Sequence, residues 1–407
     1  MSSDTVVTGL GVVAPNGLGT DDFWKATLKG TCGIGEPQEY DASAYSARLA
    51  GRIRDFAPRE HLPGRLMPQT DRVTRLALVA ADWALADAEV TMAELDEFTC
   101  GVVTSNATGG FEFSHREMRK LWTKGPDHVS VYQCFAWFYA VNTGQISIRN
   151  NMRGPGGVLV AEQAGGLDAI GHARRVLRRG RARLMLTGGV ESSFDPWGWV
   201  SHLASGTVSE ARERTEAYLP FDPRANGYVP GEGGAILTLE DAGAARGRTG
   251  RSPYGRITGY AATFDPPPAS GRPGGLRRAI DAALADARLR PDQIDLVVAD
   301  AAGTAALDAE EAAALRAVFG PRAVPVCAPK TMVGRLMAGA GPLDVVYGLL
   351  AMRDGVIPPA VHVDSVVDDY DIDLVLTEPR PCDIASVLVL ARGAGGFNTA
   401  LIAEAMP

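Results

Sequence analysis

The segment 155–180 places Gln163 where many enzymes hold a nucleophile. The apolar run 158–161 predicts a buried strand, and apolar residues at helical spacing over 167–177 predict a helix, so the chain turns from strand to helix at 162–164. A side chain on such a turn stands beside the free N–H groups of a helix N-terminus, which is a common position for a nucleophile. A glutamine amide donates and accepts hydrogen bonds but offers no nucleophile. We therefore expect no covalent catalysis at this turn.

Composition and charge argue against several classes of protein. With 407 residues, 46% of them hydrophobic, the chain is long enough for two or three domains. The net charge of −8 disfavours a nucleic-acid-binding protein, because phosphate contacts need concentrated positive charge. The first residues contain no basic stretch before an apolar run, and no apolar run reaches the ~18 residues of a membrane span. We expect neither export nor insertion into a membrane.

The cysteines indicate neither a zinc site nor a disulfide framework. They form no C-x-x-C pair and their number is odd, so we expect a reducing cytoplasm, no metal ion and no cofactor. The five are Cys32, Cys100, Cys134, Cys327 and Cys382.

The elements that must position Gln163 alternate between strands and helices. The segment 241–253 is small and polar, which is typical of a linker. Beyond it the order of elements repeats, which predicts two related α/β halves, 1–250 and 251–407, each with a mostly parallel sheet and packed helix face to helix face. The predicted segments 6–9, 72–88, 100–105 and 183–189 correspond to 256–259, 276–288, 294–299 and 386–390.

Two further segments have a distinctive pattern. A helix is predicted from Phe111, with Ser114 and Met118 on the same face. The segment 129–140 is unusually aromatic and includes Phe135. Core packing is the more common explanation for such aromatic residues, and an interface or the wall of an apolar channel is the alternative.

Several motifs resemble those of the β-ketoacyl synthases over almost the whole chain. They are VVTGLGVVAPNG at 6–17, VAEQAGGLDAIGHARR at 160–175, SFDP at 193–196, PFDPRANGYVPGEGG at 220–234 and APKTMVG at 328–334. The resemblance is greatest to the chain length factors, the ketosynthase β subunits of bacterial aromatic (type II) polyketide synthases, in which glutamine replaces the active-site cysteine. It implies the thiolase-like fold, in which two pseudo-symmetric α/β halves form a layered α-β-α-β-α sandwich.

The same resemblance implies a degenerate active site. Gln163 stands where active members of the family have cysteine, and Asp300 and Arg335 stand where they have two histidines. Lys330 is retained, as is Glu311, which the family pairs with that lysine. Glutamine cannot form a thioester and a guanidinium cannot act as a base, so we expect no independent condensing activity.

The two charged replacements suggest a plug. The histidines of the family face one pocket, so we expect Asp300 and Arg335 to form an ion pair there with Gln163 hydrogen-bonded nearby. The alternative is that each charged side chain points separately to solvent. Ala394, in the glycine-rich segment 392–396, stands at the family's gate, where phenylalanine is usual.

The resemblance implies a noncatalytic subunit that determines chain length. Its partner would be a catalytic ketosynthase α subunit, and the poly-β-ketone would grow in a channel at the interface between the two subunits. Phe111, Ser114, Met118 and Phe135 would line that channel and limit the product by their bulk; otherwise they are ordinary core residues. An acyl carrier protein would deliver the substrate, and the basic cluster 174–183 either docks it or is a solvated helix end.

Two other functions remain possible from the sequence. A glutamine at the cysteine position also occurs in ketosynthases that decarboxylate malonyl carrier protein to an acetyl primer. Those relatives keep both histidines, so this alternative ranks second. The other is that a different residue, such as Cys134, forms the thioester.

Overall fold

The computed structural model describes residues 4–37 and 41–406. Its main sheet runs in the order β13-β11-β10-β15-β16-β9-β1-β8-β7-β5-β6, with β2 paired to β1. The two halves meet where β1 and β9 pair antiparallel, at Val6 opposite Arg256 and Val7 opposite Gly255. One hydrogen-bonded sheet therefore passes through both halves.

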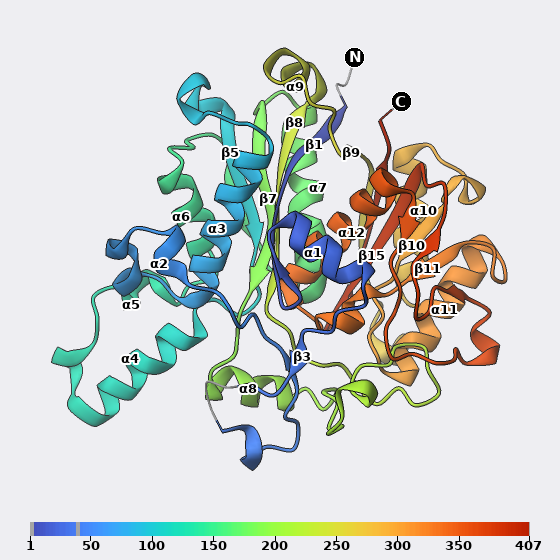
Figure 1. Cartoon of the computed structure of the whole chain (residues 1–407), viewed down its shortest axis with the longest axis horizontal. Coiled ribbons are helices and arrows are strands. Elements are labelled where there is room, and N and C mark those ends of the chain that lie inside the picture. Colours follow the sequence, from blue (N-terminus) through green and yellow to red (C-terminus); the bar gives the residue numbers. More distant parts are fainter. Residues whose placement is uncertain (1–3, 38–40, 407) are drawn as a thin grey trace.

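The first half contains the elements up to α9, shown in blue to yellow-green in Figure 1. The strands of its part of the main sheet are β1 (Thr5–Ala14), β2 (Gly17–Leu18), β5 (Cys100–Ser105), β6 (Gly156–Leu159), β7 (Leu184–Glu191) and β8 (Gly233–Asp241). A separate small sheet pairs β3 (Ile34–Gly35) with β4 (Ala50–Gly51). The helices are α1 (Thr20–Leu28), α2 (Pro58–His61), α3 (Arg72–Asp87), α4 (Phe111–Lys124), α5 (Gln133–Ala136), α6 (Val141–Arg149), α7 (Gly165–Arg178), α8 (Pro196–Leu203) and α9 (Ala242–Arg248).

The second half repeats this plan. The strands are β9 (Gly255–Phe264), β10 (Leu296–Val298), β11 (Pro325–Cys327), β13 (Asp373–Leu374), β15 (Ser386–Gly393) and β16 (Phe397–Glu404), with β12 (Val356–Ile357) and β14 (Arg380–Pro381) paired separately. The helices are α10 (Leu276–Ala287), α11 (Ala305–Phe319) and α12 (Ala340–Asp354).

Equivalent strands of the two halves have the same neighbours in the same relative direction. β8 pairs antiparallel with β1 and β7, as β16 does with β9 and β15. The pairs β7–β5 and β5–β6 are parallel, as are β15–β10 and β10–β11. The predicted repeat of elements is confirmed, but the prediction of a mostly parallel sheet is wrong. A short turn joins β15 to β16, and a connection of that length permits only antiparallel pairing.

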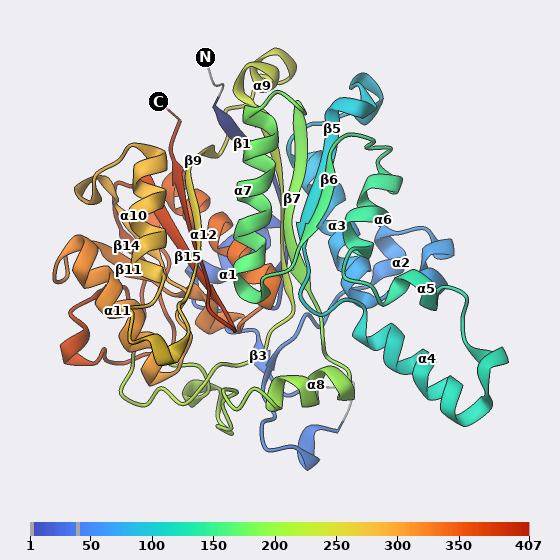
Figure 2. The same cartoon turned by 180° about the vertical axis from the view of Figure 1, so that it is seen from behind.

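The helices form three layers around the two halves of the sheet. Figures 1 and 2 show α3 and α6 outside the first half, α10 and α11 outside the second, and α7 with α12 between them. The helices α7 and α12 contact each other and the strands on either side, and α12 is buried from Ala340 to Ala351. The five-layer α-β-α-β-α arrangement and the packing of helix face on helix face agree with the prediction.

Three local predictions need correction. The segment 241–253 is not an unstructured linker, because the Asp241 carboxylate caps helix α9 by accepting hydrogen bonds from the N–H groups of Gly243 and Ala244. The run 158–161 is not a buried strand, since β6 is the last strand of the sheet and is only partly covered. Core packing is wrong for three aromatic residues, because Trp137, Phe138 and Tyr139 are 46%, 37% and 38% exposed.

The described part of the chain contains no helix with both the length and the apolar character needed to cross a bilayer.

Candidate functional site

The strand-to-helix turn holds Gln163 inside the protein. β6 leads into a single 3₁₀ turn at Glu162–Ala164, and α7 begins at Gly165. Glu162 has φ of 49°, in the left-handed region that side-chain-bearing residues rarely adopt. A Cβ atom on Gly166 would lie 2.3 Å from the carbonyl oxygen of Ala338, so only glycine allows α7 to approach so closely. This close packing leaves Gln163 with 0% exposure.

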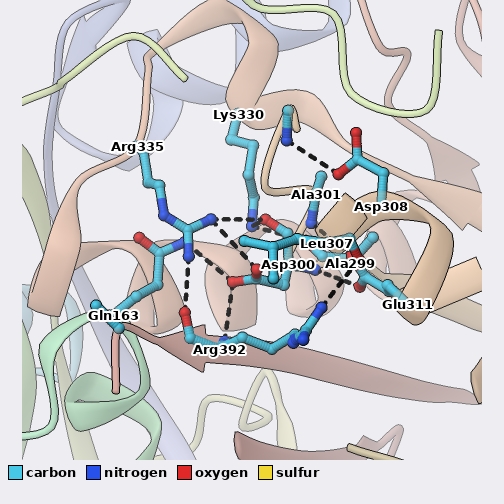
Figure 3. A network of polar contacts seen from close by, with 12 residues as sticks. Gln163, Ala299, Asp300, Ala301, Leu307, Asp308, Glu311, Lys330, Arg335 and Arg392 are labelled. Carbon is cyan, nitrogen blue, oxygen red and sulfur yellow. Dashed lines mark hydrogen bonds and ion pairs between the residues drawn. The ribbon is translucent and has the colours of Figure 1, made fainter. Parts of the chain in front are cut away.

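Asp300 and Arg335 form a buried ion pair beside Gln163, as Figure 3 shows. Arg335 Nη1 lies 3.2 Å from Asp300 Oδ2, and Gln163 Nε2 donates to Asp300 Oδ1 over 3.2 Å. Asp300 is 0% and Arg335 6% exposed. The predicted ion pair, with the glutamine hydrogen-bonded to it, is therefore confirmed, and the alternative in which each charge points to solvent is wrong.

The gate segment closes this network from the side of β15. The backbone N–H of Arg392 donates to Asp300 Oδ1 over 2.9 Å, and its carbonyl oxygen accepts from Arg335 Nη2 over 2.7 Å. The N–H of Ala394 donates to the carboxylate of Glu162 over 2.9 Å. The turn that follows β15 is thus tied by its backbone to both the ion pair and the strand-to-helix turn.

Each charge of the pair stabilises the ionised form of the other. Burial raises the pKa of Asp300, but the positive charges of Arg335, Lys330 and Arg392 outweigh it and hold that pKa below its ordinary value. Burial lowers the pKa of Arg335, and the negative charges of Asp300 and Glu162 more than compensate, so that its pKa lies above its ordinary value. Both groups are ionised at neutral pH.

Lys330 and Glu311 belong to the same network but do not form the expected pair. Lys330 Nζ donates to Asp344 Oδ2 over 2.8 Å and to the carbonyl oxygens of Ala299 and Asp300. Glu311 accepts from the N–H groups of Asp300 and Ala301, over 2.7 and 2.9 Å. The expected pairing fails because Asp344, on the central helix α12, lies against the lysine, while Glu311, on α11, holds the chain after β10.

This arrangement lacks the groups that condensation needs. Both carboxylate oxygens of Asp300 already accept hydrogen bonds, and a guanidinium cannot take up a proton. Burial, followed by repulsion from Asp300, raises the pKa of Glu311 to about 7, but both its oxygens hold backbone N–H groups. The side chains of Gln163, Asp300 and Arg335 instead fill the centre of the site and bond to one another.

A cavity of about 550 Å³ lies beside the plug, the name used for the hydrogen-bonded group of Gln163, Asp300 and Arg335. Its wall includes Arg335, Arg392 and Ala394, whereas Gln163 and Asp300 do not reach it. Of the four described residues predicted to line a channel, Phe111 alone contributes to this wall, and its ring stacks on Trp197 with centroids 4.7 Å apart.

The other predicted channel residues lie on α4, which projects from the body in both views, and on α5, which contacts it (Figures 1 and 2). Ser114 is buried and accepts a hydrogen bond from Gln133 Nε2 over 3.2 Å. Met118 and Phe135 are half-buried, and Cys134 is exposed. The role of these side chains as a channel wall stays a prediction, because the opposite wall would come from another subunit.

Sequence reasoning missed Asp344 and the contribution of Arg392. A single carboxylate in the otherwise apolar stretch 340–351 was a usable signal, because a buried charge needs a partner. Nothing comparable marks Arg392, since its backbone makes the contacts to the plug. In the basic cluster, Arg174 is buried and paired with Asp286, whereas Arg175, Arg178, Arg179, Arg181 and Arg183 are exposed.

Two family models match the chain. Residues 2–245 match "Beta-ketoacyl synthase, N-terminal domain", and residues 254–364 match "Beta-ketoacyl synthase, C-terminal domain".

Curated relatives and solved structures agree with this assignment. The actinorhodin polyketide putative beta-ketoacyl synthase 2 of Streptomyces coelicolor is 59% identical, over 98% of this chain and 97% of its own length. The tetracenomycin polyketide synthase ketoacyl synthase beta subunit of Streptomyces glaucescens is 57% identical, with the same coverage of both chains. The ishigamide ketosynthase/chain length factor superposes with a TM-score of 0.90 at 25% identity over 100% of both chains.

A second solved structure contains an acyl carrier protein. It is a type II polyketide synthase carrier protein in complex with its ketosynthase bound to the hexaketide, and it matches with a TM-score of 0.89 at 25% identity over 100% of both chains. Together with the degenerate site, these findings show that the chain belongs to the β-ketoacyl synthase family, in the group of type II polyketide synthase β subunits.

Proposed function

We propose that this chain is the noncatalytic, chain-length-determining subunit of a type II polyketide synthase. It pairs with a catalytic ketosynthase α subunit, and an acyl carrier protein brings the growing poly-β-ketone to the complex. The observation that carries the proposal is the Asp300–Arg335 ion pair, which fills the reaction centre in place of catalytic groups and leaves Gln163 buried against it.

The exposed edge of the sheet supports pairing with another subunit. β6 ends the main sheet, so its outer N–H and C=O groups lack a neighbouring strand among the described residues. Several apolar side chains in the part of the chain from α4 to the residue after β6 are exposed, namely Trp122, Val131, Trp137, Ile148 and Val160. An apolar surface beside an open strand edge is costly in water, and a partner that extends the sheet would cover both.

The position of α4 and α5 supports a role in limiting product length. Both helices precede β6 in the chain; α4 carries the exposed Trp122, and the exposed Val131 and Trp137 lie on either side of α5, so a partner bound there would enclose them. The channel would then pass Phe111, Ser114, Met118 and Phe135, and larger side chains would stop elongation earlier. Since Ser114 is small and Met118 flexible, we expect a comparatively long product.

The decarboxylase alternative has less support. Gln163 has no exposed surface, and its amide nitrogen is committed to Asp300. A malonyl group in the cavity would meet Arg335 before it met the glutamine, and would reach Gln163 only by separating the ion pair. Breaking a buried pair costs several kcal/mol.

Co-expression with a ketosynthase α subunit and its carrier protein tests the proposal. We expect the two ketosynthase chains to copurify in a 1:1 complex that makes a polyketide of defined length from malonyl carrier protein. The isolated chain should make none, and should release acetyl carrier protein no faster than its Gln163→Ala variant. The free cysteines fit a reducing cytoplasm, where we place the complex. Elongation by the isolated chain would overturn the proposal.

A further inference from the structure

Ser193, His202 and Tyr228 form a hydrogen-bonded chain in the wall of the cavity beside the plug. Ser193 Oγ lies 2.8 Å from His202 Nε2, and His202 Nδ1 lies 3.3 Å from the Tyr228 hydroxyl. All three residues line the cavity, and all three are buried. They come from different elements: the loop after β7, helix α8 and the loop before β8.

The neighbours of His202 fix the orientation of its ring. The rings of Phe194 and Trp199 pack around the imidazole, with centroids 6.3 and 6.4 Å from its own. The Tyr228 hydroxyl oxygen lies 3.3 Å from His202 Nδ1 and can accept the Nδ1 proton. In that tautomer Nε2 carries a lone pair directed at Ser193 Oγ, as a general base requires.

A serine hydroxyl paired with an oriented imidazole is the usual form of an activated oxygen nucleophile. Here the pair lines a cavity of about 550 Å³, which is large enough for a small molecule and whose wall does not include Gln163. Burial alone lowers the pKa of His202 to about 4, so the imidazole is neutral at physiological pH and its unprotonated nitrogen is available to the serine hydroxyl.

We propose that Ser193 is an acyl-accepting nucleophile, with His202 as its general base, for short acyl thioesters that enter this cavity. In the cell the thioester would come from the carrier protein, and that supply rests on the proposed function. The chemistry itself requires only this chain and a thioester.

The step is an acyl transfer without oxidation or reduction. Ser193 Oγ attacks the thioester carbonyl carbon, and its proton passes to His202 Nε2. The tetrahedral intermediate then collapses, the C–S bond breaks, and the leaving thiolate takes the proton from His202. The products are an acyl ester on Ser193 and a free thiol. Attack by water on this ester, with the same base, would release the carboxylic acid and restore the serine.

The purified full-length chain, without a partner, provides the test. We expect incubation with the acetyl thioester of N-acetylcysteamine to add one acetyl group, located on Ser193 by peptide mass spectrometry. The label should resist neutral hydroxylamine, which cleaves thioesters, and so be distinguished from acylation of Cys134. Ser193→Ala should abolish labelling, and His202→Gln should slow it about a hundredfold or more. Tyr228→Phe, which removes one hydroxyl, should slow it to a smaller extent.

Ser147→Ala is the matched control. Ser147 lies outside the cavity lining, and its hydroxyl donates to the Met152 carbonyl and has no imidazole partner, so labelling should be unchanged. If His202→Gln fails to fold, Ser193→Ala and Tyr228→Phe still decide, since each removes one polar atom. No acetylation of the wild-type chain, or equal labelling of Ser193→Ala, would overturn the inference. Copurification with the ketosynthase α subunit is measured separately, so a failure here leaves the proposed function standing.

Discussion

The guanidinium of Arg335 and the carboxylate of Asp300 lie 3.2 Å apart in a part of the protein that solvent hardly reaches. Each is the nearest opposite charge of the other, and Lys330 and Arg392 add further contacts around them. A charge pair of this kind is costly to break and is no acid or base at neutral pH.

Removing one charge should destabilise the protein more than removing both. Asp300→Ala strands a buried guanidinium and should lower the free energy of unfolding by about 3–5 kcal/mol, whereas Asp300→Leu combined with Arg335→Met should cost less. Urea denaturation measures both. The exposed pair Arg290–Asp292 is the control, and Asp292→Ala should leave the free energy of unfolding almost unchanged. A double variant less stable than the single would contradict this account.

Gln163→Cys alone should not restore condensation. The new thiol would lie beside the Asp300 carboxylate, which disfavours a thiolate, and both histidine positions would still hold charged residues. We expect no elongated product from malonyl carrier protein by liquid chromatography and mass spectrometry. Product formation by this single variant would show that the ion pair does not block the chemistry.

Enlarging Ser114 should shorten the polyketide. The serine is buried on α4 against Gln133, so Ser114→Trp would project bulk from the helix face assigned to the channel. In the reconstituted complex we expect the main product to lose one or more ketide units. Thr123→Trp, at an exposed position of the same helix, is the control and should leave the product unchanged. Equal products from both variants would favour ordinary core packing of Ser114.

A charge beside β6 should weaken subunit pairing. Val160 is exposed next to the open edge of the sheet, and Val160→Glu would place a carboxylate in the surface assigned to the ketosynthase α subunit. We expect the dissociation constant to rise about tenfold or more, measured by isothermal titration calorimetry. Phe264→Glu changes another exposed apolar residue on a different part of the fold and should have no such effect.

Stability should decline as the pH rises from acid to neutral, partly because of Glu191. Burial raises the pKa of Glu191 from 4.5 to about 7. Between these values the folded chain holds a proton that the unfolded chain has lost, so the free energy of unfolding falls as pH rises through this window. Glu191→Gln should flatten that part of the slope in urea denaturation at pH 5 and pH 8. The exposed Glu213→Gln should leave the slope as it is.

Local sequence patterns were enough to predict most elements but not their surroundings. Strand β5 has the predicted bounds, and α3 begins at Arg72, where the predicted segment 72–88 begins, because hydrophobic periodicity depends on neighbours in sequence. The exposure of Trp137 was not predictable in this way, since an aromatic run packs equally well in a core or against another subunit.

The candidate site was likewise only partly predictable from the sequence. Gln163, Asp300 and Arg335 were identified from motifs, and their proximity followed from the family's pocket. The partner of Lys330 was not predictable in this way, because the carboxylates of both Asp300 and Asp344 interact with it and only the packing of α12 decides which one it contacts. The hydroxyl–imidazole chain of Ser193 spans three elements separated in sequence, and no motif links them.

The buried pair also has an evolutionary consequence. To install the cysteine and two histidines of active family members, three positions would have to change, and whichever charged position changed first would leave its opposite stranded in the interior. Such single-step intermediates would lose stability before they gained any activity. The ion pair therefore makes the centre of this protein harder to alter step by step than its surface.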